Sequence, residues 1–192
     1  MFGKEKIKII QLQCDFGARP EAPGAALGGN ALLKYDDAHD KIFSNFPVAA
    51  CGENKRSERE FITTRQVDKI YSQLQTGVSL IENALSENYF PFIISGDHSN
   101  AMASVSAIHN FFPEKTIGVI WIDAHADMHT PLTTPSGNMH GMPLAALMAT
   151  DNNRYQRNVP NDDELQYWNK LKELGSRKIV PKISPRDVLL IG

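Results

Sequence analysis

Residues 117–127 have the sequence Ile-Gly-Val-Ile-Trp-Ile-Asp-Ala-His-Ala-Asp, an apolar run that leads directly into alternating acidic and imidazole side chains. The run is apolar at successive positions, which is typical of a strand buried on both faces of a parallel sheet. A second stretch has the same form, because residues 89–94 are largely apolar and are followed by Ser95-Gly-Asp-His98. Open α/β sheets bind ligands outside the carboxyl ends of their strands. Both polar ends therefore mark a predicted site.

The rest of the chain alternates between strand-like and helix-like segments. Further strands are predicted over residues 8–14, 46–51 and 187–192, and helices over 31–43, 62–88, 99–112, 142–148 and 163–174. The clearest helix has apolar residues at spacings of three and four, namely Val67, Ile70, Leu74, Val78, Ile81 and Leu85. Residues 17–30 are rich in glycine, proline and alanine and predict a loop. We therefore predict one α/β domain over residues 1–192, a three-layer α/β/α sandwich with a mostly parallel sheet covered on both sides.

The last predicted strand has only Gly192 after its last apolar residue, Ile191. A buried parallel strand normally continues into a loop and a covering helix. We therefore expect the domain to be incomplete at its C-terminus.

Composition excludes several classes of protein. The 192 residues carry 20 Lys and Arg against 22 Asp and Glu, a net charge of −2, which lacks the cationic field of a nucleic-acid or anionic-membrane binder. No apolar run reaches the roughly 18–20 residues of a membrane span, and the start has no secretory h-region. We expect a cytoplasmic protein without nucleic-acid or membrane partners. Two cysteines, Cys14 and Cys51, are too few for a disulfide scaffold, and we expect both to be buried.

The acidic and imidazole residues at the strand ends predict a metal site. Asp123, His125 and Asp127 are spaced by two, and a strand-like backbone would point all three to one side. Clustered carboxylates repel one another, and a divalent cation removes that cost. Oxygen and imidazole ligands without thiolate favour Mn²⁺, with Zn²⁺ or Fe²⁺ as competitors. The alternative is that Asp123 caps a turn and the other two residues lie in an ordinary loop; His98 and His140 favour the metal.

Three motifs occur in order along the chain: Ser95-Gly-Asp-His-Ser99, Asp123-Ala-His-Ala-Asp127 and Ser136-Gly-Asn-Met-His-Gly-Met-Pro143. They resemble the ordered motifs of the ureohydrolase superfamily, and residues 130–141 are most similar to arginases. Agmatinases and formimidoylglutamases share the second motif but diverge in that loop. The resemblance implies an arginase-like fold, two Mn²⁺ ions, and hydrolysis of the guanidino group of L-arginine to ornithine and urea. It also implies a small-molecule guanidino substrate and a possible homo-oligomer.

The resemblance assigns roles by motif position. His98 and Asp127 would bind one ion, His125 the other, and Asp123 both. His140 matches a proposed proton shuttle, and Asp127 is the second residue assigned to catalysis. The α-carboxylate of the substrate would be held by Thr134, Ser136 and Asn138, and by His129, which stands where arginases usually carry asparagine. Without the resemblance, residues 134–138 would be interpreted as turn chemistry and His140 as an ordinary loop histidine.

Besides His129, two features depart from the family pattern. The glycine-rich residues 22–29 match the family only loosely. The family's later D-x-D motif and guanidinium-binding glutamate have no counterpart in residues 1–192. Four ligand residues are few for two Mn²⁺ ions, which prefer about five or six donors each. We therefore expect impaired activity. The alternatives are an agmatinase or another guanidino-substrate ureohydrolase, an inactive metal-binding fragment, and a mononuclear zinc amidohydrolase.

Overall fold

The computed structural model describes residues 6–18, 24–53 and 55–192. Its five strands form two sheets, with strand orders β2-β1-β3 and β4-β5. Every ladder is parallel. The strands are β1 (Ile7–Gln13), β2 (Val48–Gly52), β3 (Phe90–Ser95), β4 (Val119–Ile122) and β5 (Val188–Ile191). The predicted α/β class with parallel strands is confirmed, but the described strands are divided between two sheets because no ladder among them joins β3 to β4.

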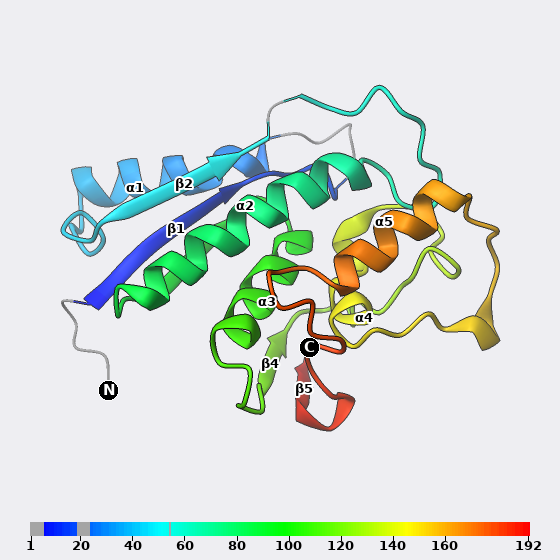
Figure 1. The fold of residues 1–192 in the computed structure, drawn as a ribbon. Helices are drawn as coiled ribbons and strands as arrows, with labels where there is room; N and C mark the ends of the chain where they lie inside the picture. The colour runs from blue at the N-terminus through cyan, green and yellow to red at the C-terminus, as the bar shows by residue number, and fades with distance from the viewer. Residues whose placement is uncertain (1–5, 19–23, 54) are drawn as a thin grey trace.

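In the described part of the chain, five α-helices accompany the strands (Figure 1). They are α1 (Gly28–Ala38), α2 (Val67–Ser86), α3 (Ala101–Phe111), α4 (Pro143–Leu147) and α5 (Asp162–Lys172). Helix α2 starts later than predicted because Gln66 has a left-handed backbone, with φ 60°. Helix α1 begins inside the predicted loop over residues 17–30, of which residues 19–23 lie outside the described part of the chain.

Strand β1 lies between two helical layers. Leu12 faces α2, where a Cβ atom added at Gly77 would approach its side chain to 3.0 Å. The neighbouring residue Gln11 faces α1, where a Cβ atom at Gly29 would lie 2.9 Å from its Oε1 atom. Successive side chains of a strand point to opposite faces. Helices α1 and α2 therefore cover opposite faces of the β2-β1-β3 sheet, which forms the three-layer part of the fold (Figure 1).

Helix α2 anchors the core. Its six predicted apolar residues, Val67, Ile70, Leu74, Val78, Ile81 and Leu85, are all buried, which confirms the helical pattern. Residues of α3, α4 and α5, including Met102, Leu144 and Trp168, complete the same cluster. Trp121 of β4 belongs to this cluster and Val188 of β5 packs against it, so the core extends from one sheet to the other.

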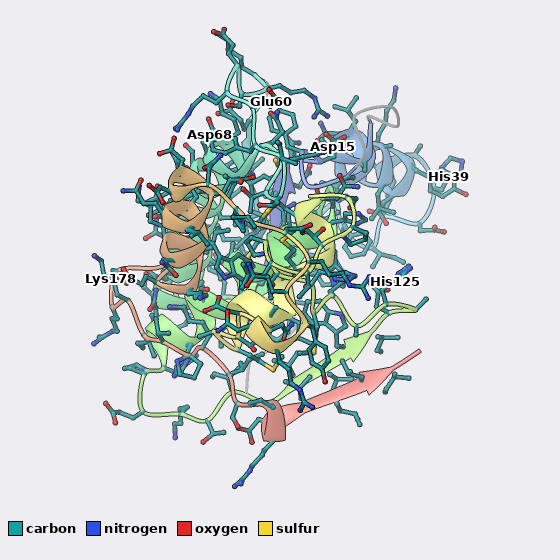
Figure 2. All side chains as sticks on the ribbon, turned by 90° about the vertical axis from the view of Figure 1, so that its right-hand side faces the viewer. Asp15, His39, Glu60, Asp68, His125 and Lys178 are labelled. Carbon is teal, nitrogen blue, oxygen red and sulfur yellow. The ribbon has the colours of Figure 1, made fainter. Side chains whose placement is uncertain are left out.

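The β4-β5 pair is covered on one face. Trp121 and Val188 point into the core. On the other face, register pairs Ile120 with Leu189 and Ile122 with Ile191, and these four side chains are 68%, 56%, 76% and 46% exposed. Figure 2 shows the two strands side by side at the lower edge of the molecule. The prediction that both faces are covered is wrong for β4 in the described residues, whereas the last predicted strand was expected to lack a covering helix.

The two cysteines differ. Cys14 is buried, as predicted, whereas Cys51 at the end of β2 is only partly buried. Neither forms a disulfide.

No helix in the described part of the chain is both long and apolar enough to cross a membrane.

Candidate metal centre

His98 follows the carboxyl end of β3. Asp97 caps the short 3-10 turn His98–Asn100 by accepting hydrogen bonds from the amides of Ser99 and Gly17, each at 2.8 Å. Burial raises the pKa of Asp97, and the hydrogen bonds from Ser99 and Gly17 oppose that rise. The His98 ring stacks on Trp121 of β4, with ring centroids 4.3 Å apart. The imidazole is therefore held between the ends of the two sheets.

Asp123 and Asp127 follow the carboxyl end of β4, which ends at Ile122. Asp123 Oδ1 accepts a hydrogen bond of 2.8 Å from the backbone amide of His125, which closes a turn. Asp127 has a left-handed backbone, with φ 48°, and its carbonyl accepts a hydrogen bond from the amide of Leu144 at 3.1 Å. This turn brings the buried Asp127 carboxylate back towards Asp123.

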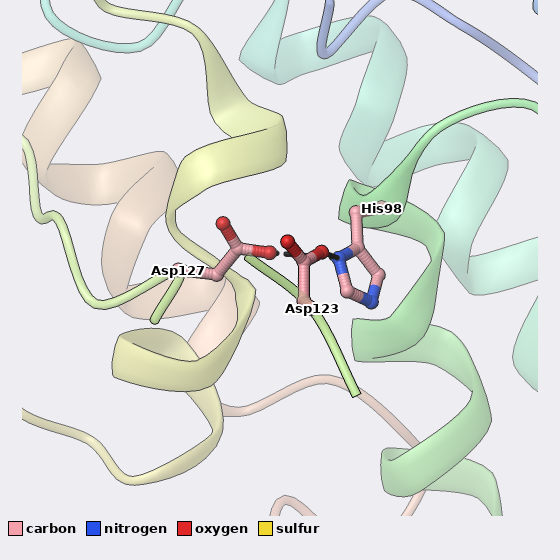
Figure 3. A group of neighbouring side chains, drawn as sticks. All are labelled: His98, Asp123 and Asp127. Atoms are coloured by element: carbon pink, nitrogen blue, oxygen red, sulfur yellow. Dashed lines mark ion pairs between the residues drawn. The ribbon is translucent and has the colours of Figure 1, made fainter. Parts of the chain in front are cut away.

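Three side chains converge as a result (Figure 3). His98 Nδ1 lies 2.8 Å from Asp123 Oδ2 and 2.7 Å from Asp127 Oδ2. One ligand atom from each residue falls within 4.8 Å of the other two. The Asp127 side chain is buried, and its Oδ2 atom contacts the same His98 nitrogen that Asp123 Oδ2 faces. We call His98, Asp123 and Asp127 the strand-end group.

The strand-end group fits a divalent cation. Its donors are one imidazole nitrogen and two carboxylate oxygens, a set that suits Mn²⁺, Zn²⁺ or Fe²⁺. A cation would also offset the repulsion between the Asp123 and Asp127 carboxylates, which both face His98 Nδ1. Without one, the Asp127 carboxylate raises the pKa of His98 against the opposing effect of burial, and Asp123 adds to the rise. The His125 amide lowers the pKa of Asp123, and the His125 and His98 imidazoles add to that effect.

His125 lies outside the strand-end group. The prediction of a strand-like backbone from Asp123 to Asp127 is wrong, because β4 ends at Ile122 and the chain bends. The His125 side chain is 83% exposed, and its Nδ1 atom lies 3.3 Å from Asp123 Oδ1. The two oxygens of Asp123 therefore face two different imidazoles, His98 and His125. The alternative that Asp123 closes a turn holds together with the convergence, since its Oδ1 atom accepts the His125 amide.

A cavity of about 650 Å³ opens onto the strand-end group. All nine residues predicted for the site line it: His98, Asp123, His125, Asp127, His129, Thr134, Ser136, Asn138 and His140. Their individual roles stay predictions. Residues separated by more than 40 positions in the sequence are thus brought to one surface.

The loop of residues 134–140 forms one wall of the cavity. Thr134 is buried, and its hydroxyl oxygen accepts hydrogen bonds from the amides of Ser136 (3.3 Å) and Gly137 (3.0 Å). Ser136 Oγ accepts the amide of Asn138 at 3.2 Å, and the buried Asn138 Oδ1 has no hydrogen-bond partner. Turn chemistry therefore shapes this loop, while hydroxyl hydrogens and one amide group remain available to a ligand.

Two histidines stand at the rim of this wall. His129 Nδ1 lies 3.5 Å from Thr133 Oγ1, and the His140 amide donates to the carbonyl of Gly17 at 3.1 Å. Both imidazoles are exposed to the cavity side of the molecule. Either ring is placed to contact a molecule bound in the cavity.

The sequence did not reveal two further residues of the cavity, Asn152 and Tyr155. Asn152 has a left-handed backbone and donates from Nδ2 to the carbonyl of Met128 at 2.9 Å. Both lie in a hydrophilic stretch without motif or periodicity, so the sequence held no signal that distinguishes them from a solvated loop.

Comparison with known proteins agrees with this fold. The sequence profile of the Arginase family matches residues 5–181. An arginase of Staphylococcus aureus (strain COL) is 43% identical over 151 residues, which cover 73% of this chain and 48% of that protein. The arginase structure from Bacillus cereus has a TM-score of 0.70 and 26% identity, covering 96% of this chain and 55% of its own. The arginase of Entamoeba histolytica, solved with L-ornithine, has the same fold, with a TM-score of 0.73, 23% identity, and coverage of 98% and 58%.

Fold and motifs together define a member of the ureohydrolase superfamily. Within it, the chain belongs to the arginase family. The chain spans about half the length of the curated relatives it matches.

Proposed function

We propose that this chain carries part of the active site of a manganese-dependent, arginase-type ureohydrolase, which converts L-arginine to ornithine and urea. The observation that carries the proposal is the convergence of His98, Asp123 and Asp127 in a cavity that is also lined by the loop of residues 134–140. The cavity of about 650 Å³ is within the ordinary range for small-molecule sites.

The strand-end group would hold the first Mn²⁺ ion. Asp123 is suited to contact a second ion as well, because its Oδ1 atom faces His125 while Oδ2 faces His98. The chemistry that Mn²⁺ supplies in such a group is a lowered pKa of water and stabilisation of developing negative charge.

The wall formed by the loop of residues 134–140 would bind the amino-acid end of the substrate. Ser136 exposes its hydroxyl, the Thr134 hydroxyl retains its hydrogen, and Asn138 offers an amide, so these groups can donate to an α-carboxylate. His129 adds an imidazole donor at the same wall. With the carboxylate held there, the guanidino group would reach towards the strand-end group.

His140 would move the proton that the reaction requires. Its imidazole lines the cavity and is exposed, and its backbone is fixed by the bond to Gly17. A neutral imidazole can accept a proton and return it to the leaving amine. Asp127, buried beside His98, would hold the His98 imidazole in position during that transfer.

We propose that residues 1–192 alone hydrolyse L-arginine slowly. The described residues offer the strand-end group and His125, whereas two Mn²⁺ ions prefer about five or six donors each. The proposal also includes a cytoplasmic location and a homo-oligomer, which the balanced charge of the chain allows.

The test is metal and ligand binding by the purified chain. We expect calorimetry to detect Mn²⁺ binding and L-arginine binding to the Mn²⁺-loaded chain. We expect a urea assay to detect slow urea release. Ser136→Ala is expected to weaken L-arginine binding about tenfold through loss of a hydrogen bond to a charged group. The same substitution should leave the binding of agmatine, which lacks the α-carboxylate, unchanged.

Three outcomes would contradict the proposal. Stoichiometric binding of one Zn²⁺ in preference to Mn²⁺ would favour a mononuclear amidohydrolase. Binding of agmatine in preference to L-arginine would favour an agmatinase. Mn²⁺ binding that survives Asp127→Ala unchanged would remove the strand-end group from the site.

A further inference from the structure

Glu164 is a buried carboxylate that no motif accounts for. It stands in the first turn of α5, is 2% exposed, and forms no ion pair with a basic side chain of the described residues. Its Oε2 atom accepts the amide of Asn161 at 3.0 Å, which completes a capping box. A capping box requires no further partner of this carboxylate.

The second oxygen of Glu164 binds a segment a hundred residues earlier in the chain. Oε1 accepts the amides of Thr63 at 2.5 Å and Thr64 at 3.2 Å. A buried carboxylate is costly unless its hydrogen bonds are satisfied. These contacts therefore fix residues 63 and 64 relative to α5.

The segment held by Glu164 lies directly against the loop of residues 134–140, which forms one wall of the cavity. The amide of Arg65 donates to the carbonyl of Gly137 at 2.8 Å. Gly137 has φ +76°, and a Cβ atom there would clash with the carbonyl oxygen of Ile62. The backbone of residues 62–65 is thus the surface on which Gly137 rests.

Gly137 lies between the residues that face the ligand. The Thr134 hydroxyl accepts its amide at 3.0 Å, and Ser136 and Asn138 are its neighbours in the chain. A shift of the Gly137 carbonyl would therefore displace the donors of this wall while leaving His98, Asp123 and Asp127, which lie on other elements, in place.

We propose that Glu164 is a positioning residue for the ligand-binding loop of residues 134–140. It acts through Thr63, Thr64 and Arg65, and it sets affinity for the amino-acid end of the substrate without contributing to the metal group. This inference rests on the proposed function, because the loop's ligand is assigned there.

The experiment compares Glu164→Ala with Asn161→Ala as the matched control. Both variants break the capping box, but Asn161→Ala leaves the bonds from Thr63 and Thr64 to Glu164 intact. Native-state hydrogen exchange is followed at the amides of Arg65 and Gly137. We expect about tenfold faster exchange in Glu164→Ala, and less than about twofold change in Asn161→Ala.

Binding measurements separate positioning from general destabilisation. In Glu164→Ala, we expect the dissociation constant of L-arginine to rise about tenfold and that of Mn²⁺ to change less than about twofold. Glu164→Gln retains one acceptor oxygen and should recover part of the lost L-arginine affinity.

Two results would overturn the inference: unchanged exchange at Gly137 in Glu164→Ala, or equal acceleration in the Asn161→Ala control. A different result would overturn the proposed function, namely absence of L-arginine binding to the Mn²⁺-loaded wild-type chain. In that case the exchange at Arg65 and Gly137 still decides whether Glu164 positions the loop.

Discussion

The two sheets of the molecule are buried to very different extents. Strand β1 is paired on both edges and covered on both faces, and Ile9, Ile10 and Leu12 are at most 1% exposed. Strand β5 is paired only with β4 among the described strands, and its residues from Leu189 to Ile191 are 46–56% exposed. The strand-end group joins these regions, because His98 follows β3 whereas Asp123 and Asp127 follow β4. The geometry of the site therefore depends on the less buried of the two.

Truncation of one leucine in each region should give the largest difference. Leu12→Ala removes a side chain packed between β1 and α2, and we expect it to cost about 3 kcal/mol of unfolding free energy. Leu190→Ala removes a half-exposed side chain and should cost less than about 1 kcal/mol. Urea denaturation of both variants measures the two values. Equal costs would mean that β5 is as well packed as β1.

Addition of Mn²⁺ should reduce the contrast between the regions. An ion held by His98 and by Asp123 and Asp127 ties β3 to β4, and ligand at a hundred times its dissociation constant stabilises a folded chain by about 2.7 kcal/mol. We expect hydrogen exchange to slow more in β4 than in β2. Removal of the ion with a chelator should reverse the effect.

Asp127→Asn is the control for this metal effect. It preserves the shape of the side chain and removes the charge that faces His98. Stabilisation by Mn²⁺ that persists in this variant would show that the ion binds elsewhere.

The same contrast explains what the sequence could predict. The pattern of α2 and the apolar strands were sufficient because periodicity and burial are local properties of the chain, and all six predicted residues of α2 are buried. The separation of β3 from β4 was not predictable, since pairing depends on which strands are available and not on strand composition. The exposure of Ile120 and Ile122 was missed for the same reason.

The order of the motifs along the chain was sufficient to predict which residues lie together. All nine predicted residues line one cavity, but the alternation assumed for Asp123, His125 and Asp127 was replaced by a turn with a left-handed Asp127. Asn152 and Glu164 were missed because their importance arises from contacts with Met128 and Thr63, which are distant in the sequence. Such contacts leave no periodic or compositional signal.

A buried lysine before β5 should make the stability of the chain depend on pH. Lys182 is 1% exposed, and burial lowers its pKa from 10.5 to about 8, against the attraction of Glu173. Below pH 8 the buried ammonium destabilises the fold. Between pH 8 and 10.5 the unfolded chain binds more protons than the folded chain, so unfolding free energy rises with pH.

Replacement of this lysine tests that dependence. We expect Lys182→Met to gain about 1–3 kcal/mol at pH 7 and to flatten the rise above pH 8. The exposed Lys178 provides the control, since Lys178→Met should change stability by less than about 0.5 kcal/mol. A Lys182→Met variant that is less stable at pH 7 would show that the bond from its ammonium to the Ile179 carbonyl outweighs the cost of burial.

Thiol labelling distinguishes the two regions without altering the stability of the first. Cys14 follows β1, and burial raises the pKa of its thiol to about 12, so little thiolate is available in the folded chain. Leu190→Cys would place a thiol in the half-exposed β5. At pH 8 we expect iodoacetamide to label the introduced cysteine more than about a hundredfold faster than Cys14, because only global unfolding exposes β1. Comparable rates would instead mean that β1 opens as easily as β5, and the site would then depend on both sheets equally.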